Sequence, residues 1–129
     1  MPKRRRREHW KDEPEEHDYP AASDYLGLVL AEPTAAAVVE ALRGAETILR
    51  KAKDLVRASR LPLLGIDDPE VARDLRKVAR GELLSPVLLV RGPAAAGLTL
   101  IVADGYHRIC ASYHLDEDAD IPCRLVDLP

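Results

Sequence analysis

Five consecutive residues carry the side chains best suited to chemistry in this chain: Asp104-Gly105-Tyr106-His107-Arg108. Arg108 offers a planar guanidinium that suits phosphate oxygens, and His107 could donate to a phosphate or move a proton near neutral pH. Gly105 can adopt a backbone shape closed to other residues. Asp104 could orient His107 or help to hold a metal ion. These residue types predict a phosphate-binding turn; the alternative is a structural turn in which Asp104 caps a helix and Arg108 forms an ion pair.

The sequence around this turn predicts a strand before it and a helix after it. The apolar run 98–102 is typical of a buried strand, and residues 106–115 have helical spacing. A helix that opens here points free backbone N–H groups at one spot, and its dipole favours an anion there. The local structure and the side chains therefore predict the same kind of ligand.

A possible metal site lies on the same helix. His107, Cys110 and His114 share one helical face, and that spacing could present three metal ligands. The more ordinary interpretation is that Cys110 packs in the core and His114 faces the helix C-terminus. We therefore predict no metal site. Cys123 is expected in the core as well, and both cysteines are expected to be reduced, since they have no CxxC spacing.

A second group of cations lies on a helix predicted over residues 46–59. Lys51, Lys53 and Arg57 could bind an anionic ligand from its polar face. A solvated charged face is the ordinary explanation of such a pattern, and we favour it.

The remaining elements are predicted from capping signals and hydrophobic periodicity. Asp68 is expected to cap a helix whose first residue is Pro69, and Gly81 to stop it. The other predicted elements are helices 35–43 and 46–59, an extended edge piece at 61–64, and strands 87–90 and 121–126. Together they predict an α+β fold, in which a small mixed sheet with packed helices is preceded by a helical N-terminal extension.

The first 20 residues are polar, with a basic block at Lys3–Arg7 and an acidic run at Asp12–Asp18. Such a segment buries too little apolar surface to offset its ordering entropy, which predicts disorder. The large apolar side chain of Trp10 leaves open the alternative that the segment docks on the body of the protein or on another subunit. The predicted organisation is therefore a disordered tail at 1–20, a helical extension at 21–59 and a domain at 60–129.

The composition limits the class of protein. The length of 129 residues indicates one domain, and a hydrophobic content of 47% is enough for a core. Because Phe is absent, that core is expected to be aliphatic. The formal net charge of −3 argues against non-specific nucleic-acid binding by overall charge. No apolar run approaches the roughly 18 residues that cross a bilayer. A cytoplasmic protein without a membrane partner is the expectation.

The C-terminal half resembles the ParB/sulfiredoxin superfamily, including the segments described as ParB-like nuclease domains. The resemblance covers about residues 60–126. It rests on Leu84-Ser85-Pro86-Val87, the strand 98–102, Gly105-Tyr106-His107-Arg108 and Ile121-Pro122-Cys123-Arg124, in that order. The resemblance implies that Gly105, His107 and Arg108 bind nucleotide phosphates and that Ser85 and Pro86 line the same pocket.

Two departures from the superfamily pattern limit what the resemblance implies. Tyr106 stands where sulfiredoxins carry their catalytic cysteine, so sulfinic-acid reduction is not expected. ParB partition proteins continue into a helix-turn-helix DNA reader, whereas this chain ends at Pro129, so chromosome partitioning is not expected.

The predicted function is nucleotide binding with phosphate hydrolysis or phosphoryl transfer to a small hydroxyl acceptor. The nucleotide would be ATP, ADP or CTP, with Mg²⁺ to neutralise charge. Asp104 and His107 are the candidate catalytic residues, and the general base stays open between Asp104 and Glu46. The candidate nucleotide-binding residues are Ser85, Gly105, Tyr106, His107 and Arg108. The alternative is a non-catalytic DNA- or protein-binding regulator that uses the basic tail, and a homodimer is possible in either case.

Overall fold

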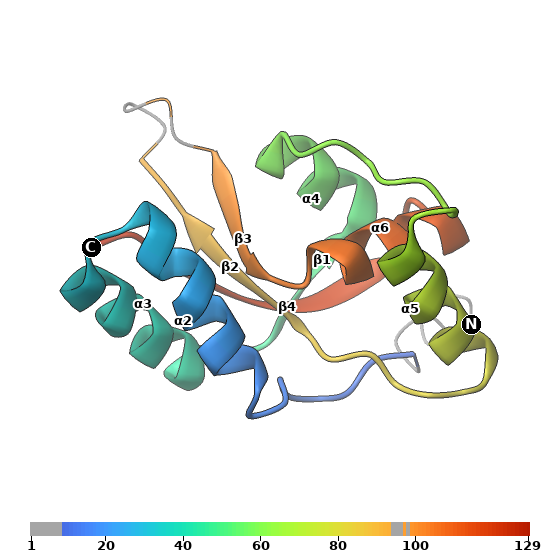
Figure 1. Ribbon diagram of the computed structural model, residues 1–129, viewed down its shortest axis with the longest axis horizontal. Helices are drawn as coiled ribbons and strands as arrows, with labels where there is room; N and C mark the ends of the chain where they lie inside the picture. Colours follow the sequence, from blue (N-terminus) through green and yellow to red (C-terminus); the bar gives the residue numbers. More distant parts are fainter. Residues whose placement is uncertain (1–8, 94–96, 98) are drawn as a thin grey trace.

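The computed structural model describes residues 9–93, 97 and 99–129 (Figure 1). Its centre is a mixed sheet of four strands in the order β1-β4-β2-β3. The strands are β1 (Ile48–Lys51), β2 (Val87–Arg91), β3 (Leu100–Asp104) and β4 (Asp120–Asp127). β2 and β4 run parallel, while β1 with β4 and β2 with β3 are antiparallel. The predicted α+β fold with a small mixed sheet is confirmed.

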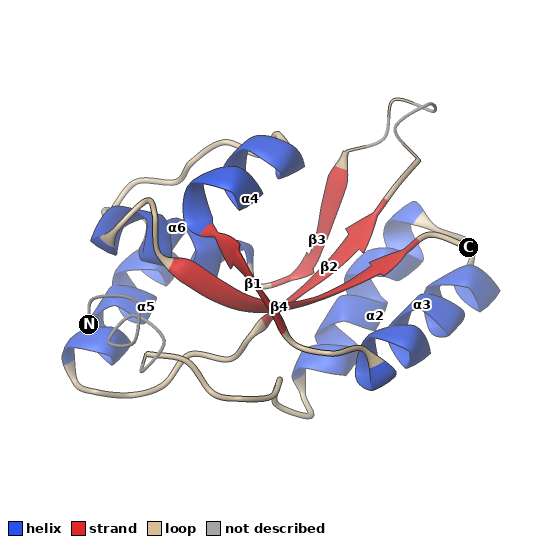
Figure 2. Ribbon diagram, turned by 180° about the vertical axis from the view of Figure 1, so that it is seen from behind, coloured by secondary structure: helices blue, strands red, loops and turns tan. Residues whose placement is uncertain are grey.

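Helices cover both faces of this sheet (Figure 2). One face carries α2 (Asp18–Val29) and α3 (Glu32–Gly44), and the other carries α4 (Ala52–Ser59), α5 (Pro69–Ala79) and α6 (Tyr106–Leu115). No helix among the described residues is long and apolar enough to cross a membrane.

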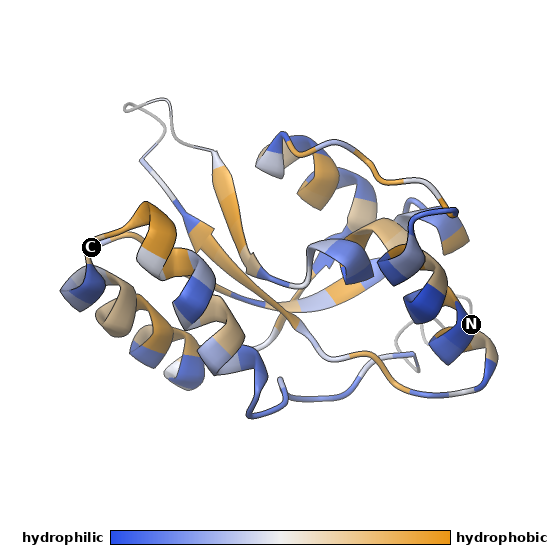
Figure 3. Cartoon of the chain, viewed as in Figure 1, coloured by the Kyte–Doolittle hydropathy of each residue, from blue (hydrophilic) through white to orange (hydrophobic). Residues whose placement is uncertain are grey.

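Strand β2 shows why both faces must be covered. Val87 and Leu89 pack in the core on the side of α4 and α6, and Leu88 and Val90 pack in the core on the side of α2 and α3. All four are fully buried. A strand that is apolar at successive positions cannot leave one face in water, and Figure 3 shows this hydrophobic run along β2.

The prediction of a helix over 46–59 is wrong in its first half. Residues 48–51 form β1, which pairs with the outer edge of β4, with Ile48 opposite Cys123 and Arg50 opposite Ile121. Only Ala52–Ser59 is helical. Helical spacing of the apolar residues was compatible with either structure, and the unpaired backbone of β4 decided the outcome. The extension predicted at 21–59 therefore supplies one strand of the sheet.

The other predicted elements lie close to those observed. Residues 106–115 form α6, as predicted, and Asp68 caps α5 by accepting from Glu70 N at 3.0 Å and Val71 N at 3.1 Å. The segment 61–64 is a loop and occupies no edge of the sheet. Both cysteines are buried and free, as predicted.

The disorder predicted for residues 1–20 needs a correction. Residues 1–8 lie outside the described residues, but residues 9–17, here termed the N-terminal arm, pack on the body, and α2 begins at Asp18. Trp10 is only 6% exposed and lies in the core cluster with Leu84 and Val87. Lys11 N donates to Leu84 O at 2.8 Å, and Leu84 N donates to His9 O at 2.7 Å. One large indole and two backbone hydrogen bonds order a segment whose average composition predicts disorder.

Candidate functional site

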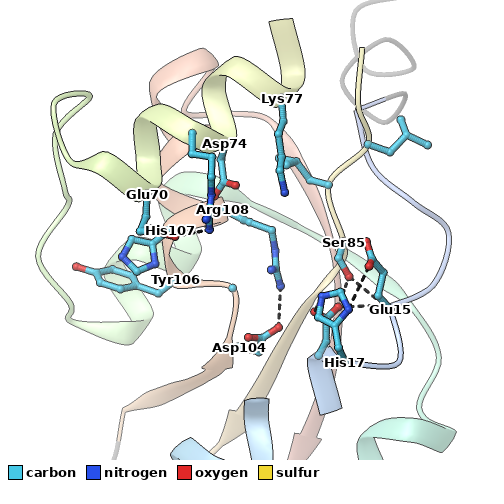
Figure 4. A pocket seen from close by; sticks show the side chains of 15 residues that line it. Glu15, His17, Glu70, Asp74, Lys77, Ser85, Asp104, Tyr106, His107 and Arg108 are labelled. Atoms are coloured by element: carbon cyan, nitrogen blue, oxygen red, sulfur yellow. Dashed lines mark hydrogen bonds and ion pairs between the residues drawn. The ribbon is translucent and has the colours of Figure 1, made fainter. Parts of the chain in front are cut away.

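A cavity of about 280 Å³ lies between the N-terminal end of α6, one face of α5 and the N-terminal arm. Six of the residues predicted from the sequence line it: Ser85, Asp104, Gly105, Tyr106, His107 and Arg108. Pro86, which was expected to line the same pocket, is not among the lining residues. Figure 4 shows how their side chains gather from separate elements. The fold thus brings Ser85, two residues before β2 begins, next to a turn that follows it by about 20 residues in the chain.

Gly105 makes the turn between β3 and α6 possible. Its φ of +109° lies in the left-handed region, which strains any residue with a side chain. A Cβ at this position would also lie 2.8 Å from Val87 Cβ and 2.9 Å from Arg108 Nη2. The position therefore needs glycine for its backbone angle and for its space.

The N-terminus of α6 is left without a cap. Among the described residues, no side chain caps this helix, and its first turn contains no acidic residue. In α5, by contrast, the Asp68 side chain accepts hydrogen bonds from the first N–H groups of the helix. The first N–H groups of α6, together with the positive end of the helix dipole, are free to bind an anion.

Arg108 lies in the first turn of α6, and its side chain is 18% exposed. Its Nη2 atom is 3.0 Å from Asp104 Oδ2 and 3.4 Å from Pro86 O. Its Nε is buried and has no hydrogen-bond partner among the described residues. The guanidinium is thus held in place by the protein on one side and keeps a donor that a ligand could satisfy.

Two carboxylates that line the cavity, those of Asp104 and Asp18, lie close enough to interact. Burial raises the pKa of Asp104, and the neighbouring Asp18 raises it further, while Arg108 opposes the shift. Asp18 is only 2% exposed. Because two nearby carboxylates resist being ionised together, this part of the cavity favours a bound proton or a bound cation.

Helix α5 contributes a polar face that the sequence analysis did not assign to the site. Glu70, Arg73, Asp74 and Lys77 all line the cavity. Burial raises the pKa of Asp74, and Arg108 is the strongest influence that opposes it. The spacing of these residues, at i, i+3, i+4 and i+7, places them on one helical face, so this signal was present in the sequence.

The N-terminal arm and the first residue of α2 add three further residues that sequence analysis missed. Glu15, His17 and Asp18 line the cavity, and Ser85 Oγ donates to Asp18 Oδ2 in a buried hydrogen bond. Glu15 N lies 3.1 Å from Ser85 Oγ and 3.0 Å from Asp18 Oδ2. The isolated Trp10 was the one signal that this segment docks, and nothing in the sequence indicated where.

Tyr106 and His107 lie side by side at the opening of α6, with ring centroids 5.4 Å apart. The Tyr106 hydroxyl donates to Pro62 O, which ties the turn to the loop before α5. Both side chains are partly exposed at the cavity, so His107 is accessible to a ligand there.

Other candidate residues lie away from the cavity. Glu46 is exposed before β1 and is not among the residues that line it, which argues against a role as general base. Lys51 and Lys53 lie near Asp120 and Asp118, at 4.0 and 3.5 Å. Arg57 borders a different hollow, with Arg60 and Arg91.

The possible metal triad on α6 does not assemble. Cys110 is fully buried with Val71 and Ala111, and His114 Nε2 lies 2.7 Å from Leu64 O. Within the described residues, no group of three or more His, Cys, Asp or Glu side chains is placed to hold a metal ion.

Comparison with family models, with curated proteins and with solved structures finds no match to this chain. The resemblance to the ParB/sulfiredoxin superfamily therefore stays a prediction from the motif and its order of elements.

Proposed function

We propose that the cavity binds the phosphates of a nucleotide, such as ATP, ADP or CTP, and that the protein transfers the terminal phosphoryl group to water or a small hydroxyl compound. The observation that carries this proposal is the uncapped N-terminus of α6 beside Arg108, whose Nε is buried without a partner in the described residues. Backbone N–H groups and a guanidinium at one place form a phosphate site.

The chain's own groups have distinct roles in this proposal. The first N–H groups of α6, Arg108 and Lys77 hold the phosphate oxygens and stabilise charge as the phosphoryl group moves. Gly105 lets the phosphates approach the backbone. His107 is placed to donate to a phosphate oxygen.

The balance of charge in the cavity supports a requirement for Mg²⁺. Five carboxylates line it, from Glu15, Asp18, Glu70, Asp74 and Asp104. Three permanent cations line it, from Arg73, Lys77 and Arg108. A polyphosphate would meet net negative charge unless a divalent ion came with it.

The oxygen ligands present suit that ion. Mg²⁺ is usually held by one or two carboxylates together with substrate phosphates and water. The five carboxylates that line the cavity are the groups that would hold it, and the bound ion would neutralise charge on the phosphates.

The volume of the cavity indicates which part of the nucleotide it holds. About 280 Å³ is near the lower limit of ligand pockets. The phosphates would therefore occupy the cavity while the base lies outside it, so we expect weak discrimination between nucleotide bases.

Calorimetric titration of the full chain with Mg²⁺–ATP and Mg²⁺–CTP tests the proposal. Arg108→Ala should weaken binding by about 1.5–3 kcal/mol, or roughly 10- to 150-fold, as for a lost hydrogen bond to a charged group. Arg80→Ala, an exposed arginine paired with Glu82 outside the cavity, is the matched control and should bind as wild type does. Equal affinity in the folded Arg108→Ala variant would remove this cavity from nucleotide binding.

The regulator hypothesis makes a different prediction. If the chain bound no nucleotide but was retained on DNA in a salt-dependent way, and lost that retention when residues 1–8 were deleted, the binding-module function would replace the enzymatic one. Nucleotide turnover that survives the same deletion would support the enzyme.

A further inference from the structure

Ser85 and Asp18 form a buried hydroxyl–carboxylate pair inside the proposed phosphate cavity. Figure 4 labels Ser85 within this cavity. The Ser85 hydroxyl donates to Asp18 Oδ2, and the two residues are 6% and 2% exposed. A serine hydroxyl is a weak nucleophile unless a base within hydrogen-bond reach accepts its proton. Asp18 meets that condition.

The base of this pair is itself held in position. Asp18 Oδ2 also accepts from Glu15 N at 3.0 Å, and Asp18 Oδ1 lies 3.5 Å from His17 Nε2. Glu15 N lies 3.1 Å from Ser85 Oγ as well. Nucleophile, base and a group that orients the base are the three parts of an activated serine site.

The pair adjoins the group proposed to bind phosphate. Arg108 Nη2 lies 3.4 Å from the carbonyl oxygen of Pro86, the residue directly after Ser85. Ser85 and Arg108 therefore border one region of the cavity. A phosphoryl group held by Arg108 would lie next to a serine whose proton already has an acceptor.

From this arrangement we propose that Ser85 is a covalent phosphoryl acceptor, so that the protein forms a phosphoserine intermediate. The inference rests on the proposed nucleotide binding and deepens it. Ser85 Oγ forms a bond to the terminal phosphorus of the nucleoside triphosphate, and the bond from that phosphorus to the bridging oxygen breaks. The nucleoside diphosphate leaves with the bonding electron pair, and the Ser85 proton passes to Asp18. Water or a small hydroxyl compound then forms a bond to that phosphorus, the bond from phosphorus to Ser85 Oγ breaks, and Asp18 returns its proton to Ser85 Oγ while the attacking hydroxyl releases its own proton to solvent.

The sequence around Ser85 allows a direct test. Trypsin cleaves after Arg80 and Arg91, which releases the fragment 81–91. Ser85 is its only hydroxyl residue, and the fragment contains no histidine. The full chain is mixed with Mg²⁺–ATP or Mg²⁺–CTP labelled at the terminal phosphate, quenched in acid during the first turnover and digested. We expect acid-stable label on fragment 81–91, approaching one phosphate per chain.

The outcomes separate this inference from the proposed function. Nucleotide cleavage without label on fragment 81–91 at any time would overturn the phosphoserine and leave nucleotide turnover standing. A parallel sample quenched in alkali would retain a phosphohistidine, and label on its peptide that contains His107 but not on fragment 81–91 would overturn the phosphoserine too. Absence of nucleotide binding in the titration would overturn both proposals.

Three variants sharpen the assignment. Ser85→Ala should lose the label, and Asp18→Asn should label about 100- to 10,000-fold more slowly, the range for loss of a general base. Ser59→Ala is the matched control, because Ser59 is buried and donates to Val56 O at 3.0 Å, away from the cavity. Labelling that persists in Ser85→Ala would refute the inference. The wild-type digest decides the question even where a variant fails to fold.

Discussion

The turn Asp104–Arg108 and the N-terminal arm line two sides of one cavity, and they differ in the sequence range of the contacts that hold them in place. The conformation of the turn is set within a few residues, by the left-handed φ of Gly105 and by the ion pair between Arg108 and Asp104 four residues apart. Longer contacts, such as that from Tyr106 to Pro62, add to it. The arm has no helix or strand of its own. Its contacts reach about 70 residues along the chain, from Glu15 to Ser85. A binding site can therefore combine one wall encoded locally with another that exists only after folding.

This difference has an energetic consequence. The turn belongs to α6 and β3, so it is stable as long as the sheet is formed. The arm depends on Trp10, on two backbone hydrogen bonds to Leu84 and on the buried Asp18–Ser85 contact. The arm should therefore be the wall that opens first.

The largest expected effect comes from Trp10→Ala. Removing a buried indole from the core cluster should lower the free energy of unfolding by about 3–5 kcal/mol, measured by urea titration. Tyr25→Ala, which removes a half-exposed aromatic side chain from α2, is the control and should change stability by less than about 0.5 kcal/mol. In the wild type, Trp10 is the single tryptophan, and its fluorescence should be blue-shifted and protected from iodide. A water-exposed emission spectrum would indicate that the tail is disordered and would leave the cavity open on the side of the arm.

Gly105→Ala tests the turn in the same way. The left-handed φ and the contact with Val87 should together lower the free energy of unfolding by about 2–5 kcal/mol. Gly27→Ala is the matched control, because a Cβ there meets nothing within 4 Å and the residue lies inside α2. That control should be stabilising by about 0.5–1 kcal/mol in the same titration. If the two variants behaved alike, the turn would not need glycine.

A smaller effect is expected from the pH dependence of stability at Asp104. Burial and the nearby Asp18 raise the pKa of Asp104 above its ordinary value of 3.8. The stability that its proton contributes is fully present below about pH 4 and is lost as the pH rises through the raised pKa. An asparagine does not ionise, so Asp104→Asn does not lose stability in this way. The variant should therefore gain stability relative to wild type as the pH rises from about 4 to 7. Asp24→Asn, on the exposed side of α2, is the control. A stability difference that stays constant with pH would contradict the buried, carboxylate-flanked environment of Asp104.

The smallest effect should come from the arm's own ion pair. Lys11 Nζ lies 2.5 Å from Glu15 Oε1, and this hydrogen bond is the main cause that lowers the pKa of Glu15. Both side chains are more than a third exposed. Lys11→Met should therefore change the free energy of unfolding by less than about 0.5 kcal/mol. A loss as large as that of Trp10→Ala would mean that charge, and not the indole, fastens the arm.

The sequence by itself determined the elements whose signals are local. Asp68 with Pro69 marked the start of α5, the spacing over 106–115 marked α6, and Gly105 marked the turn between strand and helix. Capping, periodicity and the backbone freedom of glycine each act within a few residues, so they can be seen without the fold. The side chains proposed to bind phosphate follow from that turn.

Only the tertiary structure decided where the arm, β1 and the face of α5 lie. Residues 48–51 are a strand because β4 offers an unpaired edge, and Trp10 is buried because Leu84 and Val87 form a place for it. The buried pair of Ser85 and Asp18 joins residues 67 positions apart. Contacts of this range depend on which surfaces the folded body leaves open, and no local pattern carries that information.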